Sequence, residues 1–131
     1  MAILDTNFII EYLWNVPYAA DMLDVLEQRG EILKTTSINV YELVKGAERS
    51  PNRDKDIERL YNFIRQLEVV HFNNETAKIG GKIFADLAKT GKMIDDFDVM
   101  IASIALELDE TVVTKNIKHF ERIKGLKIET Y

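Results

Sequence analysis

Four acidic residues lie where strands end or helices begin, although long stretches of sequence separate them. Asp5 closes a short apolar run at the N-terminus, and Glu42 lies shortly after a second such run. Asp96 and Asp98 open the most regular helical segment of the chain. In an open α/β sheet, ligands bind just outside the carboxyl ends of the strands. The pattern therefore predicts that the four side chains converge on one site.

Each of these acids, taken alone, has an ordinary structural explanation. Asp5 and Asp96 are good helix N-cap residues. Asp98 suits the positive end of a helix dipole, and Glu42 fits a solvated helix surface. Gathered in one place, however, the carboxylates would repel one another unless a cation neutralised them. Mg²⁺ and Mn²⁺ prefer such oxygen ligands, and phosphodiester hydrolysis uses such sites because the ion activates water and stabilises charge on the phosphoryl oxygens.

The composition limits the kinds of protein that this chain can be. With 131 residues, 47% of them hydrophobic, it has the size of one ordinary domain with its own core, and we expect a single domain over residues 1–131. No run approaches the roughly 20 apolar residues of a membrane span, and the N-terminus does not resemble a basic signal sequence. We therefore expect a cytoplasmic protein. The absence of cysteine excludes disulfides, Cys-type zinc sites and thiol nucleophiles.

The charge is unevenly distributed along the sequence. A net charge of −5 argues against a general nucleic-acid coat, because phosphate binding needs a basic surface. Residues 111–131, however, contain five Lys or Arg residues and only two Glu residues. One end of the molecule is therefore expected to be locally basic.

Apolar periodicity alternates between strand-like and helix-like segments. The predicted strands cover residues 2–4, 32–36, 69–72, 111–114 and 126–128. Helices are predicted directly after Asp5, over 18–29, from Ser37 as N-cap toward Gly46, over 57–67, from Asn73 or Asn74 to Thr90, and over 97–108. Strands that alternate with helices imply an α/β fold, with a mainly parallel sheet and helices on both of its faces.

Three motifs and their order along the chain resemble the PIN domain of VapC-type toxins. They are Ile3-Leu4-Asp5-Thr6-Asn7, Tyr41-Glu42-Leu43-x-x-Gly46 and Ile94-Asp95-Asp96-Phe97-Asp98-Val99-Met100-Ile101-Ala102, followed by Val113-Thr114-Lys115-Asn116 and Phe120. The match spans nearly the whole chain and keeps the spacing of the family. This resemblance implies a three-layer α/β/α sandwich around a central, mainly parallel sheet of about five strands.

The resemblance also implies an activity and a set of site residues. The expected enzyme is a Mg²⁺- or Mn²⁺-dependent endoribonuclease that hydrolyses RNA phosphodiester bonds and leaves 5′-phosphate and 3′-hydroxyl ends. Asp5, Glu42 and Asp98 match the core acids of the family, and Asp96 is a further metal-ligand candidate at a position that varies. Asn116 stands where many relatives carry another Asp, so this chain has one carboxylate fewer for a second ion.

Other residues are expected to support these acids or to bind RNA. Thr6 and Asn7 resemble the polar pair that supports the first acid, and Thr114 and Asn116 are expected to support the site from the segment after the fourth strand. In the basic C-terminal segment, the candidates for binding RNA are Lys115, Lys118 and His119. Each of the three also suits a solvated surface, which is the more common role of charged side chains in exposed loops.

The same resemblance implies two protein partners. The chain is expected to form a homodimer and to bind a small antitoxin whose C-terminal segment lies over the acidic pocket. Trp14 and Tyr18, near the helix break at Pro17, either line an antitoxin-binding groove or cap the core. Gly80-Gly81 lies inside a predicted helix, which indicates close helix packing within the chain or across a dimer. Nothing in the sequence identifies the RNA target.

Other classes of protein fit parts of the pattern. A phosphoacceptor receiver domain would use Thr114-Lys115, but residues 72–74, at the end of the third strand, lack the Asp that it needs. A non-catalytic RNA- or protein-binding module on a degenerate nuclease fold is the stronger alternative, because Asn116 weakens the acidic set. Metal-free cleavage would need His71 and His119 together, which nothing in the sequence indicates. His71 is instead expected to be buried or at the edge of the third strand.

Overall fold

Five short strands form one parallel sheet in the computed structural model, which describes all 131 residues. The strands are β1 (Ala2–Leu4), β2 (Leu33–Thr36), β3 (Glu68–Val70), β4 (Thr111–Val113) and β5 (Lys127–Glu129). Their order across the sheet is β3-β2-β1-β4-β5, and every neighbouring pair is parallel. The predicted sheet is confirmed.

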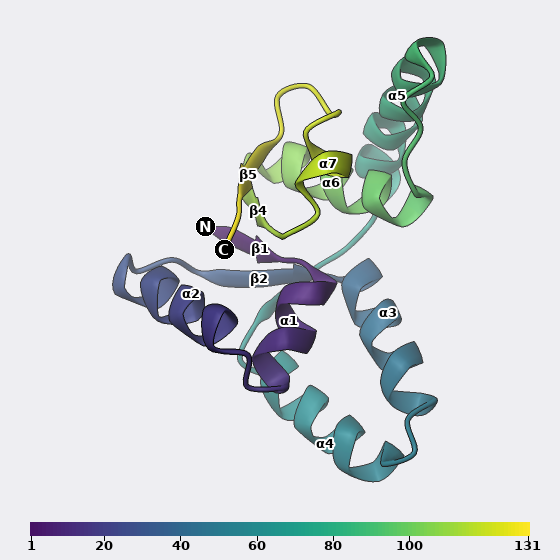
Figure 1. Ribbon diagram of the computed structural model, residues 1–131. Coiled ribbons are helices and arrows are strands. Elements are labelled where there is room, and N and C mark those ends of the chain that lie inside the picture. The colour runs from purple at the N-terminus through teal and green to yellow at the C-terminus, as the bar shows by residue number, and fades with distance from the viewer.

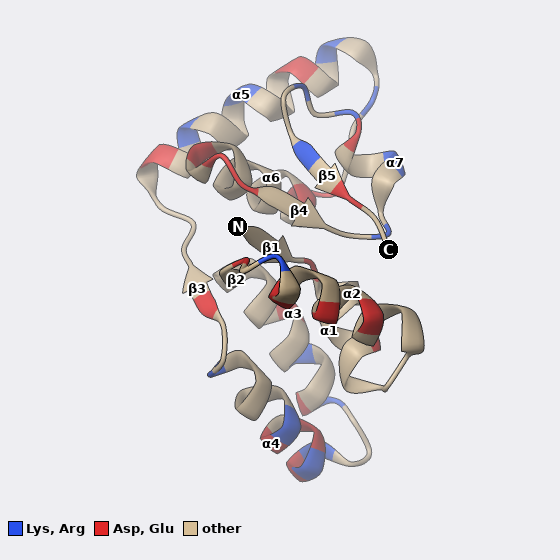
Figure 2. Ribbon diagram, turned by 90° about the vertical axis from the view of Figure 1, so that its left-hand side faces the viewer, with Lys and Arg blue, Asp and Glu red and all other residues tan.

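Seven helices cover the two faces of this sheet. They are α1 (Thr6–Leu13), α2 (Pro17–Gln28), α3 (Ser37–Glu48), α4 (Arg53–Ile64), α5 (Asn74–Thr90), α6 (Asp96–Leu108) and α7 (Ile117–Phe120). In Figure 1, α1 to α4 lie on one side of the sheet and α5 to α7 on the other, and Figure 2 shows the same two layers from another direction. The predicted α/β/α sandwich is confirmed. None of the helices has the length and apolar character that crossing a membrane requires.

The central strand β1 contributes to the core on both faces. Ala2 and Leu4 belong to a buried cluster with residues of α1 to α4, whereas Ile3 belongs to a second cluster with residues of α5 and α6. Successive side chains of a strand point to opposite faces, so even three residues serve both layers. All three are buried, which fixes the carboxyl end of β1, where Asp5 follows.

Local polar contacts move some boundaries away from the predicted ones. The N-cap of α3 is Thr36 and not Ser37, because Thr36 forms a capping box with Asn39. β3 is an edge strand and ends one residue before His71, which is exposed, so the edge alternative fits this histidine and the buried one does not. The four-residue helix α7 was not predicted, since so short a segment has no apolar period to detect.

Gly80 allows α5 to pack closely on α6. A Cβ atom at Gly80 would lie 2.9 Å from Ser103 Oγ, which is closer than real contacts allow. Ser103 is fully buried, and its hydroxyl donates to Val99 O at 2.6 Å. A Cβ atom at Gly81, by contrast, would meet nothing within 4 Å. The close packing expected from the Gly pair is therefore internal and involves Gly80.

The strand order identifies a place where ligands commonly bind. β1 has β2 on one side and β4 on the other, so the connections that leave β1 and β4 diverge across the sheet. Doubly wound sheets bind ligands at such a switch point, outside the carboxyl ends of the strands. Asp5 follows β1 and Thr114 follows β4 at this edge. The topology therefore favours this edge for a site.

Candidate active site

Asp5, directly after β1, is the most buried acid of the site, with 5% of its surface exposed. It is the N-cap of α1, and its Oδ1 accepts a hydrogen bond from the Thr6 backbone N–H at 2.9 Å. Oδ1 also accepts from Asn39 Nδ2 at 3.2 Å, and Oδ2 accepts from the Thr114 hydroxyl at 2.7 Å. Asp5 is therefore both a helix cap and a carboxylate that neutral donors from three elements hold in place.

Asn39 connects Asp5 to Glu42. The Thr6 hydroxyl donates to Glu42 Oε1 at 2.9 Å and accepts from Asn39 Nδ2 at 2.9 Å. Asn39 is itself fully buried, and its Oδ1 accepts from the Thr36 hydroxyl at 2.7 Å. Asn39 was not among the predicted site residues. The spacing Thr36-x-x-Asn39 after a strand resembles a capping box, and this signal would have pointed to it.

Asp98, in the first turn of α6, joins the site through the loop after β4. Thr114 Oγ1 accepts from the Asn116 backbone N–H at 2.9 Å, and Asn116 Nδ2 donates to Asp98 Oδ2 at 3.2 Å. His119 Nδ1 lies 3.0 Å from the same carboxylate oxygen. A continuous series of hydrogen bonds therefore runs from Glu42 through the buried polar residues to Asp98. Such supporting contacts hold functional side chains in one geometry.

Burial raises the pKa of all three acids above the ordinary value, and it is the largest cause for Asp5, Glu42 and Asp98. Hydrogen bonds act in the opposite direction, from Thr114 on the pKa of Asp5 and from His119 on that of Asp98, without outweighing burial. The negative charge of Asp98 also raises the pKa of Asp5, and both raise that of Glu42. The cluster therefore resists full ionisation unless a cation enters it.

Asp95, and not Asp96, faces this cluster. Asp95 is the N-cap of α6, since its Oδ1 accepts from the Phe97 backbone N–H at 2.8 Å, and its charge raises the pKa of both Glu42 and Asp98. Asp96 is exposed, and its carboxylate forms no hydrogen bond within the chain. Residues three apart share one side of a helix, whereas adjacent residues do not. The alternative explanation of Asp96 as a helix cap is therefore wrong, since Asp95 is the cap. The role of Asp96 as a metal ligand stays a prediction.

The remaining candidates lie at the rim of the site or outside it. Asn7 is exposed, and its side chain forms no hydrogen bond within the chain. The Lys115 ammonium lies 3.0 Å from a Glu11 carboxylate oxygen, so its charge is already paired. Lys118 is exposed and has no carboxylate partner. Among the three basic candidates, only His119 touches one of the three core acids.

The three acids have the chemistry of a site for a hard divalent cation. None of Asp5, Glu42 and Asp98 pairs with Lys or Arg, and the only basic side chain in contact with one of them is His119. Asp98 Oδ1 and Glu42 Oε2 accept no hydrogen bond from the chain, which leaves them free for a ligand. No group of three or more acidic or histidine side chains lies close enough together in this structure to hold a metal ion. Mg²⁺ typically takes one or two carboxylates and completes its shell with water and phosphate oxygens, so the donor set fits it.

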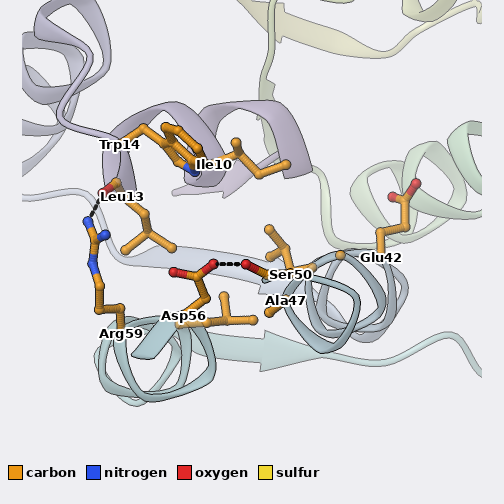
Figure 3. Close-up of a pocket in the computed structure, with 11 residues that line it drawn as sticks. Ile10, Leu13, Trp14, Glu42, Ala47, Ser50, Asp56 and Arg59 are labelled. Atoms are coloured by element: carbon orange, nitrogen blue, oxygen red, sulfur yellow. Dashed lines mark hydrogen bonds between the residues drawn. The ribbon is translucent and has the colours of Figure 1, made fainter. Parts of the chain in front are cut away.

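An apolar groove extends from Glu42 between α1, α3 and α4 (Figure 3). The cavity measures about 260 Å³ and has Trp14, which is 75% exposed, on its α1 wall. Glu42 and Arg59 mark its opposite ends, and Arg59 donates a hydrogen bond to Leu13 O. The other groove candidate, Tyr18, does not line it. Trp14 therefore fits the predicted docking surface, and Tyr18 does not.

Comparisons with known proteins agree with this geometry. The model of the PIN domain family matches residues 2–126. The tRNA(fMet)-specific endonuclease VapC of Salmonella typhimurium is 34% identical over 98% of this chain and 96% of that protein, and ribonuclease VapC2 of Haemophilus influenzae is 31% identical over the same shares. The structure of VapBC2 from Rickettsia felis, bound to a promoter DNA fragment, superposes with a TM-score of 0.91 at 27% identity and covers 99% of this chain and 98% of that one.

Proposed function

Because the chain belongs to the PIN domain family and matches VapC ribonucleases over nearly its whole length, we propose that it is an endoribonuclease and the toxin of a toxin–antitoxin pair. The observation that carries this proposal is the hydrogen-bonded series of buried polar groups that joins Glu42, Asp5 and Asp98 at the switch point of the sheet.

We further propose that Asp5, Glu42 and Asp98 hold Mg²⁺ or Mn²⁺. When bound, the ion neutralises the cluster, activates water and stabilises charge on the phosphoryl oxygens. The chain itself orients the donors. Neutral hydrogen bonds hold Asp5 on both oxygens. Asn116 and His119 contact one oxygen of Asp98 and leave the other without a partner in the chain. Attack by water on phosphorus breaks the bond to the 3′ oxygen, which leaves 5′-phosphate and 3′-hydroxyl ends.

Incubation of the purified chain with total cellular RNA tests the reaction directly. We expect cleavage with Mg²⁺ and none in excess EDTA, with 5′-phosphate ends at every new terminus. Cyclic phosphate ends that form in EDTA would instead indicate attack by the ribose 2′-hydroxyl without a metal. RNA that is bound but never cut under any condition would indicate the non-catalytic module.

The apolar groove is the proposed docking site for the antitoxin. It begins at Glu42, so a segment that lies in it can also cover the acids, as expected from the sequence. We expect Trp14→Ala to weaken the complex by about 30-fold, because Trp residues that become buried in an interface are frequent binding hot spots. Titration of the purified antitoxin, with Tyr61→Ala on α4 as the control, measures the change. Equal affinity for both variants would mean that the antitoxin binds elsewhere.

The expected homodimer stays a prediction that light scattering at micromolar concentration tests.

A further inference from the structure

Two aromatic rings lie next to the acids of the site, on the sides of α3 and α6 that face each other. Tyr41 directly precedes Glu42, and Phe97 directly precedes Asp98. The two rings meet edge to face, with their centroids 5.6 Å apart and an interplanar angle of 83°. Tyr41 nevertheless remains 55% exposed, so most of its ring is accessible. A large aromatic surface therefore stands open beside the proposed catalytic centre.

A lysine with no carboxylate partner accompanies these rings. Lys45 Nζ lies 5.3 Å from the ring centroid of Tyr41 and 5.8 Å from that of Phe97. Lys45 is three residues after Glu42, so both side chains leave α3 on the same side. It forms no ion pair, whereas the Lys115 ammonium is paired with Glu11. The ammonium group of Lys45 therefore carries a positive charge on the Glu42 side of α3 that no carboxylate of the chain neutralises.

These three side chains match what single-stranded RNA needs from a protein. Unpaired bases stack on aromatic side chains, and ammonium groups bind the phosphates between them. A cluster of acids repels the RNA backbone, so a free cation next to it offsets part of that repulsion. Only an unstacked base can lie on an exposed ring, which favours loops and single strands over duplex RNA. An anionic ligand can pair with this ammonium group, whereas an apolar protein surface cannot.

We propose that Tyr41, Phe97 and Lys45 form a base-binding subsite for single-stranded RNA. A base next to the cleaved bond stacks on Tyr41, which Phe97 holds in place, and Lys45 binds an adjacent phosphate. This proposal rests on the endoribonuclease function and names the substrate class that the active site accepts. Tyr41 is exposed and lies outside the hydrogen-bonded series, so its replacement leaves the proposed metal ligands intact.

Cleavage of a short single-stranded RNA with one cut site tests the subsite. We expect Tyr41→Leu to lower kcat/KM by roughly 5- to 100-fold, the usual loss when one stacked base loses its aromatic partner. Tyr41→Phe keeps the ring and should cleave like the wild type. Tyr61→Leu, at an exposed tyrosine on α4, is the matched control and should have no effect. Annealing the RNA to its complement should suppress cleavage by all variants.

Removal of single bases identifies the partner of Tyr41. RNAs with one abasic position next to the cut should be poorer substrates for the wild type, but no poorer for Tyr41→Leu, because each change removes the same contact.

Lys45→Gln should reduce the slope of log KM against log salt concentration by about 0.7, and the exposed Lys82→Gln should not. If the wild-type protein cuts RNA, but the effect of Tyr41→Leu is the same with and without each abasic position, the subsite proposal is wrong and the endoribonuclease function stands. The same holds if Tyr41→Leu changes only self-association or antitoxin affinity. A wild type that cuts no RNA would overturn the endoribonuclease function as well.

Discussion

Replacement of Asp98 by Asn should reduce RNA cleavage by at least about 100-fold, because it removes a charged ligand from the proposed metal site. The amide fits the local contacts well. Its oxygen can accept the hydrogen bonds that Asp98 Oδ2 receives from Asn116 and His119, and its nitrogen can take the place of Oδ1, which has no partner in the chain. The folded structure should therefore persist. Initial rates on a defined RNA, together with melting curves, measure the two effects separately.

Asp96→Asn is the matched control for this variant. It changes the same residue type in the same turn of α6, but at an exposed position. We expect it to cleave at the wild-type rate. An equal loss of activity in both variants would mean that Asp96 is a metal ligand after all, as the sequence suggested. Wild-type activity in Asp98→Asn would remove Asp98 from the site.

Asp5→Asn is a less clean probe of the metal site, although its activity should also collapse. Both oxygens of Asp5 accept hydrogen bonds, and Oδ2 is the acceptor for the Thr114 hydroxyl. An amide nitrogen at that place would leave the buried hydroxyl proton without its acceptor, which costs about 1–3 kcal/mol. A loss of stability in Asp5→Asn would therefore reflect this contact and would say little about metal binding.

The sequence predicted the sheet and the position of the acids because both depend on strong local patterns. Short segments with apolar or β-branched residues mark the strands, and β1 is entirely apolar. Parallel strands all end at one edge of the sheet, so Asp5 after β1 necessarily lies there. The hydrogen bonds from Asn39 and Thr114 depend instead on how α3 and the β4 loop approach Asp5 in three dimensions. No spacing in the sequence specifies such an approach.

The residue at which α6 begins could not be determined from the sequence, and this uncertainty affected the predicted site most. Asp95 and Asp96 are adjacent, and both are good N-cap residues, so residue type could not decide between them. A shift of one position rotates a side chain by about 100° around the helix axis. Both side chains are exposed, but only the charge of Asp95 raises the pKa of Asp98. The hydrogen bond from the Phe97 backbone N–H to Asp95 identifies Asp95 as the cap, and this contact is visible only in the structure.

Without metal, the Asp98→Asn variant should become more stable relative to the wild type as the pH rises. Burial raises the pKa of Asp98 in the folded state above its value of 3.8 in the unfolded chain, so the folded state binds this proton more tightly. That contribution to stability is fully present below pH 3.8 and is lost as the pH rises through the raised pKa. Asn does not titrate, so the difference between the two free energies of unfolding reports the titration of Asp98 together with its coupling to His119.

Mg²⁺ should reverse this order near neutral pH. An ion that binds only the folded wild type stabilises it by about 2.7 kcal/mol at 100 times its Kd, whereas Asp98→Asn, which binds the ion weakly, should gain little. Melting curves of both proteins in EDTA and in Mg²⁺, from about pH 4 to pH 8, measure the two effects together. Asp96→Asn should follow the wild type throughout. If Asp98 were only a residue that favours the helix dipole, Mg²⁺ would shift the melting temperatures of all three proteins equally, because no ligand would have been removed.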